Sequence, residues 1–107
     1  MFLSQLKLRD AGDGVWEVVE PLVFATAAED APPGISVPAG FQTDFRFIPP
    51  PAREWIIPVG PATGPAVIYA YLRRSGLERH VAMDVFQDAL RVNGVPKPRR
   101  SLLLLSL

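Results

Sequence analysis

The 107-residue sequence predicts an α+β fold, in which a small N-terminal antiparallel β-sheet, made of a hairpin plus short strands, packs against three or four C-terminal helices. Segments rich in β-branched and aromatic residues lie before Pro49, and helical spacing of apolar residues begins after it. The length and the 49% apolar composition suit one core. Residues 1–107 are therefore expected to form a single domain.

The first half of the chain has the pattern of strands. Apolar side chains in residues 2–8 lead into the turn cluster Asp-Ala-Gly-Asp-Gly at 10–14, and the β-branched and aromatic stretches 15–19 and 22–24 follow. This order predicts a β-hairpin. After a loop, residues 35–37 alternate like a short strand.

The second half has the pattern of helices. A short helix is expected over residues 51–57, because proline is favoured in a first turn. A second is expected over 65–75, where Gly76 would cap it, and a longer one over 78–92. A last helix should begin near Pro98 and continue through the leucines, which we expect to pack on the hairpin with one or two left exposed.

Composition and charge exclude several classes of function. The chain has no cysteine and one histidine, so we expect no disulfide, no metal site and no cofactor. Eleven basic and eleven acidic residues cancel, which argues against nucleic-acid or membrane-surface partners. Residues 1–50 carry a charge of −4 and residues 51–107 one of +4, so we expect an acidic half to lie beside a basic half. Without an apolar span or a signal peptide, the sequence predicts a cytoplasmic or recombinant soluble protein.

Few residues outside the core suggest chemistry. Asp84 and Asp88 are four residues apart on the long predicted helix and point away from its apolar face, so we expect solvated carboxylates. His80 lies outside the same face and suits a surface or interface role. The basic residues at the start of the last helix are also expected to be solvated; they are Lys97, Arg99 and Arg100.

Residues 35–45, which read ISVPAGFQTDF, resemble the signature of a phage and prophage family of unknown function, numbered thirteen-fifty-three. Members of that family read VPAGF, then TDFASIP, then an HD pair with LY shortly after, and then R and ADxxF in a second helix. The resemblance covers about residues 15–105. In the second helix of the family it includes Arg79, Ala82, Phe86, Ala89 and Gly94.

The chain departs from the family at its polar positions. Arg46 and Phe47 follow Phe45 where the family has AS, Tyr69 and Ala70 stand for HD, Arg73 stands for the tyrosine of LY, and Met83 stands for the aspartate of ADxxF. The resemblance implies a catalytic or metal-binding polar cluster in other members. Here only Thr43 and Asp44 remain, so we expect no catalytic residue and no hydrolase activity.

The replacing residues predict a surface for binding. Tyr69 and Arg73 are one helical turn apart, as are Met83 and Gln87, and aromatic, Met and Arg side chains are enriched in interfaces. We expect Phe47, Tyr69 and Met83 to form one contiguous exposed patch that anchors a partner protein. The full predicted partner-binding set is Arg46, Phe47, Tyr69, Arg73, His80, Met83 and Gln87.

Three functions follow from these patterns. The favoured hypothesis is a non-catalytic protein-binding module, engineered on the scaffold of this family. The first alternative is a natural, divergent phage tail or assembly protein, for which self-association would be expected. The second is a hydrolase of the same family whose site the sequence does not reveal.

Overall fold

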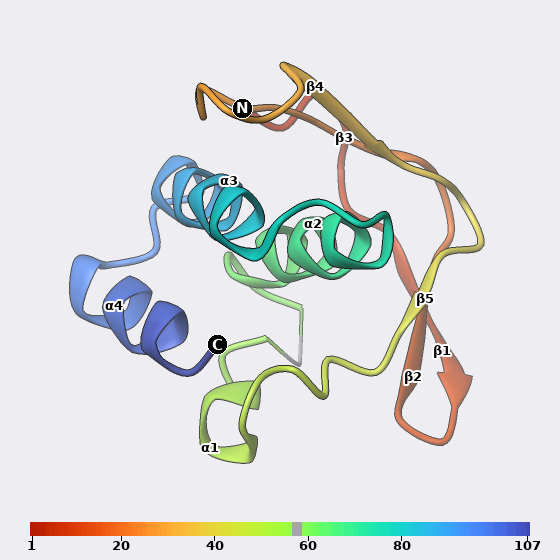
Figure 1. The fold of residues 1–107 in the computed structure, drawn as a ribbon. Coiled ribbons are helices and arrows are strands. Elements are labelled where there is room, and N and C mark those ends of the chain that lie inside the picture. The colour runs from red at the N-terminus through yellow and green to blue at the C-terminus, as the bar shows by residue number, and fades with distance from the viewer. Residues whose placement is uncertain (57–58) are drawn as a thin grey trace.

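The computed structural model describes residues 1–56 and 59–107, which form an α+β fold with its strands on one side and its helices on the other (Figure 1). Strands β1 (Leu8–Gly12), β2 (Val15–Val18) and β5 (Gln42–Thr43) form an antiparallel sheet in the order β1-β2-β5. Strands β3 (Leu22–Ala25) and β4 (Gly34–Val37) form a second, two-stranded sheet.

The predicted hairpin over the 10–14 turn is confirmed as β1 and β2. Gly12, Asp13 and Gly14 all have left-handed backbone, with φ of 89°, 55° and 76°, which glycine adopts without steric cost. The Asp10 carboxylate accepts a hydrogen bond from the Gly12 amide at 2.8 Å and so supports the turn.

Residues 22–24 belong to the other sheet, where Leu22 lies opposite Val37. Pro21 separates the two sheets, because proline has no amide hydrogen to donate to a ladder. The Ser4 hydroxyl bridges the break: it donates to the Pro21 carbonyl at 3.1 Å and accepts from the Val23 amide at 2.8 Å.

The described residues contain four helices, α1 (Pro50–Arg53), α2 (Thr63–Arg74), α3 (Arg79–Val92) and α4 (Lys97–Leu105). The helix expected over 51–57 is shorter than predicted and gives way to turns at 54–56, while Ile57 lies outside the described residues. No described helix has the length and apolar character needed to cross a bilayer.

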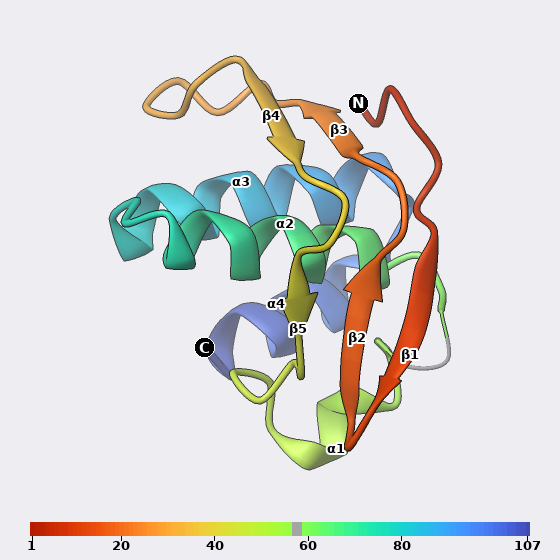
Figure 2. The same cartoon turned by 90° about the vertical axis from the view of Figure 1, so that its right-hand side faces the viewer.

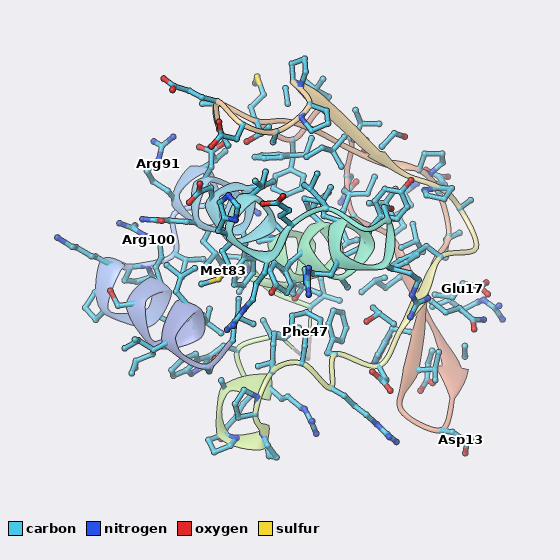
Figure 3. All side chains as sticks on the ribbon, viewed as in Figure 1. Asp13, Glu17, Phe47, Met83, Arg91 and Arg100 are labelled. Atoms are coloured by element: carbon cyan, nitrogen blue, oxygen red, sulfur yellow. The ribbon has the colours of Figure 1, made fainter. Side chains whose placement is uncertain are left out.

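Helix α2 lies at the centre of the described structure, with β4 on one side and α3 on another (Figure 2). Eight of its 12 residues are buried. The core cluster to which α2 belongs includes the fully buried Phe24, Phe45 and Phe86. Figure 3 shows how side chains fill the space around this helix. This central position decides which side chains can reach the surface.

Helix α4 packs on α3 and not on the hairpin, so that expectation was wrong. Leu103 is fully buried, whereas Leu102 and Leu105 are exposed, in agreement with the expectation that one or two leucines would be. The Arg99 guanidinium stacks over the Trp55 ring at 5.2 Å, so it is not simply solvated. This contact ties α4 to the segment that follows α1.

Candidate functional site

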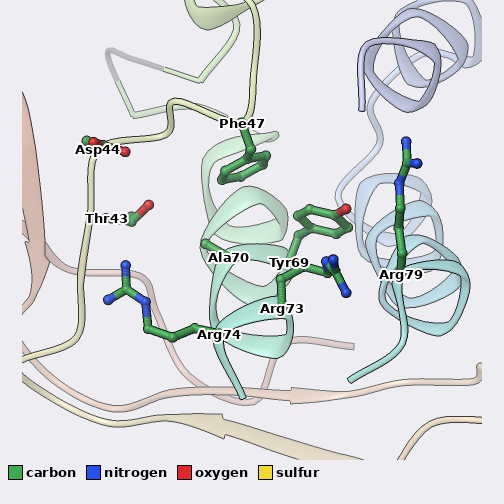
Figure 4. Close-up of a pocket in the computed structure, with 8 residues that line it drawn as sticks. All are labelled: Thr43, Asp44, Phe47, Tyr69, Ala70, Arg73, Arg74 and Arg79. Carbon is green, nitrogen blue, oxygen red and sulfur yellow. The ribbon is translucent and has the colours of Figure 1, made fainter. Parts of the chain in front are cut away.

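A pocket of about 480 Å³ opens between the end of β5 and the turn after it, the last turns of α2, and the first residue of α3 (Figure 4). We call it the arginine pocket. Its lining residues are Thr43, Asp44, Phe47, Tyr69, Ala70, Arg73, Arg74 and Arg79.

The α2 side of the pocket follows from helical spacing. Tyr69 and Ala70 precede Arg73 and Arg74 by one turn, so the four side chains share one face of the helix. The small side chain of Ala70 leaves the space that the pocket occupies, and the Phe47 ring lies above it (Figure 4).

Tyr69 is buried, with 5% of its surface exposed, which corrects the prediction that it would be an exposed anchor. Its ring packs between those of Phe47 and Phe86, at centroid distances of 5.2 and 5.4 Å. The prediction assumed that α2 buries a single apolar stripe. Because other elements cover this helix on several sides, a position outside that stripe is also enclosed.

The opposite wall is a tight turn at residues 43–47. The Thr43 hydroxyl accepts a hydrogen bond from the Phe45 amide at 3.2 Å, and the Asp44 carboxylate accepts one from the Arg46 amide at 3.1 Å. Phe45 has left-handed backbone, with φ of 57°, and its side chain is buried in the core. Burial of this ring offsets the cost of the unusual backbone, and the turn places Phe47 against α2.

Each of the three pocket arginines is held by a main-chain oxygen atom. Arg73 donates from Nη1 to the Leu77 oxygen at 2.9 Å, and Arg79 donates to the main-chain oxygen of Leu107. Arg74 donates to the Gln42 oxygen at 3.1 Å.

Arg74 is held a second time by an aromatic ring. Its guanidinium lies over the Phe41 ring at 5.0 Å. A guanidinium carries five N–H donors, so each arginine keeps most of its hydrogen-bonding capacity.

The pocket has a surplus of positive charge. Its one acidic residue, Asp44, pairs with Arg46, which lies outside the lining, at 3.1 Å. Within residues 1–56 and 59–107, no Asp or Glu carboxylate lies within ion-pair distance of Arg73, Arg74 or Arg79.

The ion pairs explain this surplus. Each of those formed by the described residues joins partners from the same half of the chain, for example Lys7 with Glu20 and Arg91 with Asp88. The acidic first half therefore does not neutralise the basic second half through ion pairs. The arginines at the end of α2 and the start of α3 keep their charge available.

The structure gathers only part of the predicted partner-binding set. Phe47, Tyr69 and Arg73 line the arginine pocket together. Met83 is half-buried against the core and His80 is exposed beside Glu78, at 3.3 Å, and neither lines the pocket. The predicted exposed patch of Phe47, Tyr69 and Met83 is therefore wrong.

Two other predicted residues also lie outside the lining. The Arg46 side chain is 81% exposed and its guanidinium pairs with Asp44. Gln87 is exposed and lies at a second pocket, beside Asp84 and Asp88.

Sequence reasoning missed Arg74 and Arg79 as site residues. Their positions carried a usable signal: Arg73 and Arg74 end one helix, and Arg79 begins the next after a short turn. Two antiparallel helices joined by a short turn bring the end of the first and the start of the second together. Arginines at these positions therefore lie at the same end of the helix pair.

Asp88 is not the solvated carboxylate that was predicted, because only 11% of its side chain is exposed. One of its oxygens accepts hydrogen bonds from the Thr26 hydroxyl and the Ala27 amide, both at 3.0 Å, and the other pairs with Arg91 at 2.8 Å. Burial acts to raise the pKa of Asp88, but the bonds from Ala27, Arg91 and Thr26 together outweigh it and lower the pKa below its usual value. Asp88 thus fixes the 26–28 loop to α3.

The arginine pocket combines strong hydrogen-bond donors with an aromatic wall. It offers one carboxylate and no histidine among its lining residues. A nucleophile there would have Asp44 as its single candidate base, and Asp44 is engaged with Arg46. The arrangement is suited to holding an anion beside an apolar group.

Comparison with known proteins supports the resemblance found in the sequence. The sequence model of a family described as "Protein of unknown function (DUF1353)" matches residues 16–106. Searches of the curated proteins and of the solved structures found no match.

Proposed function

The chain belongs to the DUF1353 family of proteins of unknown function, and we propose that it is a non-catalytic protein-binding module whose binding site is the arginine pocket. One observation carries this proposal: three guanidiniums line one pocket with the Phe47 ring. Each is fixed by a main-chain oxygen, and none has an Asp or Glu partner among the described residues. Pre-arranged arginines with an aromatic neighbour are typical of binding hot spots.

The non-catalytic part of the proposal rests on the family signature. The pocket lining includes six positions at which the signature is polar, namely 43, 44, 47, 69, 70 and 73. Phe47, Tyr69, Ala70 and Arg73 occupy four of these positions and supply contact area or positive charge, but no general base. We propose that this surface was rebuilt for binding, by engineering or by divergence of a phage protein.

Selection of peptides would test the binding site. Peptides enriched from a random displayed library on the wild-type protein should shift the amide resonances of Ala70 and Arg73. The Arg73→Glu substitution should weaken peptide binding about tenfold or more, because it reverses a charge in the interface. The matched control is Lys97→Glu on α4, an exposed charge outside the pocket, which should bind as the wild type does. Peptides that bind elsewhere and ignore Arg73→Glu would contradict the proposal.

Two measurements separate the alternatives. Hydrolysis of p-nitrophenyl acetate or p-nitrophenyl phosphate that disappears in Asp44→Asn would favour the hydrolase and exclude a non-catalytic module. Sedimentation experiments test the structural alternative. Concentration-dependent assembly into large oligomers that persists in every pocket variant would favour a structural phage protein.

A further inference from the structure

We infer that the arginine pocket is an oxyanion site, and that the group it takes is a phosphate monoester carried on a flat apolar group. This inference deepens the proposed function, on which it rests, by naming the chemistry that the partner presents. It follows from the charge, the donors and the shape of the pocket, taken in turn below.

The charge of the lining favours a dianion. Three guanidiniums and one acidic side chain line the pocket, and that side chain, Asp44, is already paired with Arg46 at 3.1 Å. A carboxylate ligand brings one negative charge, whereas a phosphate monoester carries about −1.5 to −2 at neutral pH and three acceptor oxygens. The monoester therefore matches the surplus better.

The donors lie together on one side of Ala70. Figure 4 shows the Tyr69 hydroxyl and the guanidiniums of Arg73 and Arg79 on this side. The Tyr69 hydroxyl has no hydrogen-bond partner among the described residues. Every side-chain polar atom that is buried in the described structure does have a partner, so the Tyr69 hydroxyl is not one of the buried atoms. The hydroxyl of this otherwise buried side chain is therefore accessible from the pocket and adds a neutral donor beside the two cations.

The far end of the pocket limits the ligand to one anionic group. Asp44 and Thr43 lie on the other side of Ala70, next to Arg74 (Figure 4). The Asp44 carboxylate has no hydrogen to donate, so a second phosphate would find Arg74 as its one charged donor at this end, which disfavours polyphosphates and nucleic-acid backbones.

The size and the aromatic wall imply a carrier group. A pocket of about 480 Å³ is larger than a phosphate needs. Phe47 is half-buried, and its ring faces the pocket above Ala70. A flat apolar group attached to the phosphate can stack on this ring and exclude water from the guanidiniums.

The main-chain oxygen atoms reduce the entropy that binding costs. An unrestrained arginine loses rotamer freedom when it grips a ligand, about 0.5–1.5 kcal/mol for each immobilised side chain. Arg73, Arg74 and Arg79 are each already restrained by a hydrogen bond to a main-chain oxygen. Their unused N–H groups remain free to bind the phosphate oxygens.

Phenyl phosphate is the direct probe, with inorganic phosphate and benzoate as partial mimics. In titrations followed by amide chemical shifts, phenyl phosphate should bind tighter than either mimic and shift residues around Ala70. The substitutions Arg73→Gln and Arg79→Gln should each weaken the binding of phenyl phosphate about tenfold, and the control Lys97→Gln should leave it unchanged. Phe47→Ala should remove the advantage of phenyl phosphate over inorganic phosphate. Thermal unfolding checks that each variant is folded.

Two further arms identify the carrier and separate this inference from the proposed function. A phosphotyrosine peptide that binds tighter than adenosine monophosphate supports both proposals. Tighter binding of the nucleotide supports the oxyanion site but contradicts a protein partner. No saturable binding of phenyl phosphate, or binding that is unchanged in the Arg73→Gln/Arg79→Gln double variant, overturns the oxyanion site. The selected peptides would in that case still test the protein-binding module independently.

Discussion

Asp88 on α3 accepts a hydrogen bond from the hydroxyl of Thr26, 62 residues earlier in the chain, at an oxygen-to-oxygen distance of 3.0 Å. The same carboxylate oxygen accepts the Ala27 amide, and the Thr26 hydroxyl in turn accepts the Ala28 amide at 3.1 Å. This small network holds the loop between β3 and β4 against the helices. One largely buried carboxylate therefore joins the acidic half of the chain to the basic half.

Replacing Asp88 should destabilise the fold. Asp88→Ala leaves the Ala27 amide and the Thr26 hydroxyl without their acceptor, which should lower the free energy of unfolding by about 1–3 kcal/mol in urea titrations. Asp84 is the matched control, since it lies one helical turn earlier and is exposed. Asp84→Ala should change stability by less than about 0.5 kcal/mol. Equal effects of the two substitutions would show that the network contributes nothing.

The contribution of Asp88 should depend on pH in a defined direction. Its pKa is lower in the folded protein than in the unfolded chain. The stabilisation is therefore fully present above the unfolded pKa and is lost as the pH falls through the folded one. The stability difference between wild type and Asp88→Asn should be constant from about pH 6 to 8 and shrink below about pH 4. A difference that grows on acidification would refute this assignment.

Tyr69 should behave as a core residue. Tyr69→Ala removes a ring packed between Phe47 and Phe86 and should cost about 3–5 kcal/mol in the free energy of unfolding. Tyr69→Phe retains the ring and should unfold within about 1 kcal/mol of the wild type, because the hydroxyl faces the pocket. If Tyr69→Ala kept the wild-type melting temperature, the exposed-anchor prediction would be restored.

The β1–β2 turn should depend on glycine at position 14. Gly14 has φ of 76°, and an added Cβ would meet no atom within 4 Å, so an alanine there tests backbone strain alone. Gly14→Ala should cost about 1–2 kcal/mol. Gly34 has equally open surroundings without a positive φ, and Gly34→Ala should be neutral or slightly stabilising. Thermal unfolding of both variants is the measurement.

Local signals made most of the fold predictable. The Gly-rich turn predicted the first hairpin. Apolar spacing, with Gly76 as the cap of α2, predicted both ends of α2 and of α3 to within two residues. The partition of the strands into two sheets was not predicted. It depends on which strands meet across long separations, as Trp16 and Thr43 do, and no short-range pattern records such a pairing.

The site was predictable only where local rules sufficed. Phe47, Tyr69 and Arg73 were correctly placed near one another, but burial of Tyr69 depends on cover from Phe47 and Phe86, which are distant in sequence. Arg74 and Arg79 contribute positive charge to the pocket because no Asp or Glu carboxylate reaches them in the described structure, and the sequence alone does not show this. Such relations are properties of the tertiary fold.

The central position of α2 has a consequence for synthesis on the ribosome. All five strands precede α2 in the chain, so their apolar faces emerge before the helix that covers them. Until residues 63–74 leave the exit tunnel, the two small sheets have little to pack on and expose side chains such as Phe24 and Val37. Nascent chains that stop before α2 are therefore expected to need a chaperone, whereas chains that extend through α3 should fold without one.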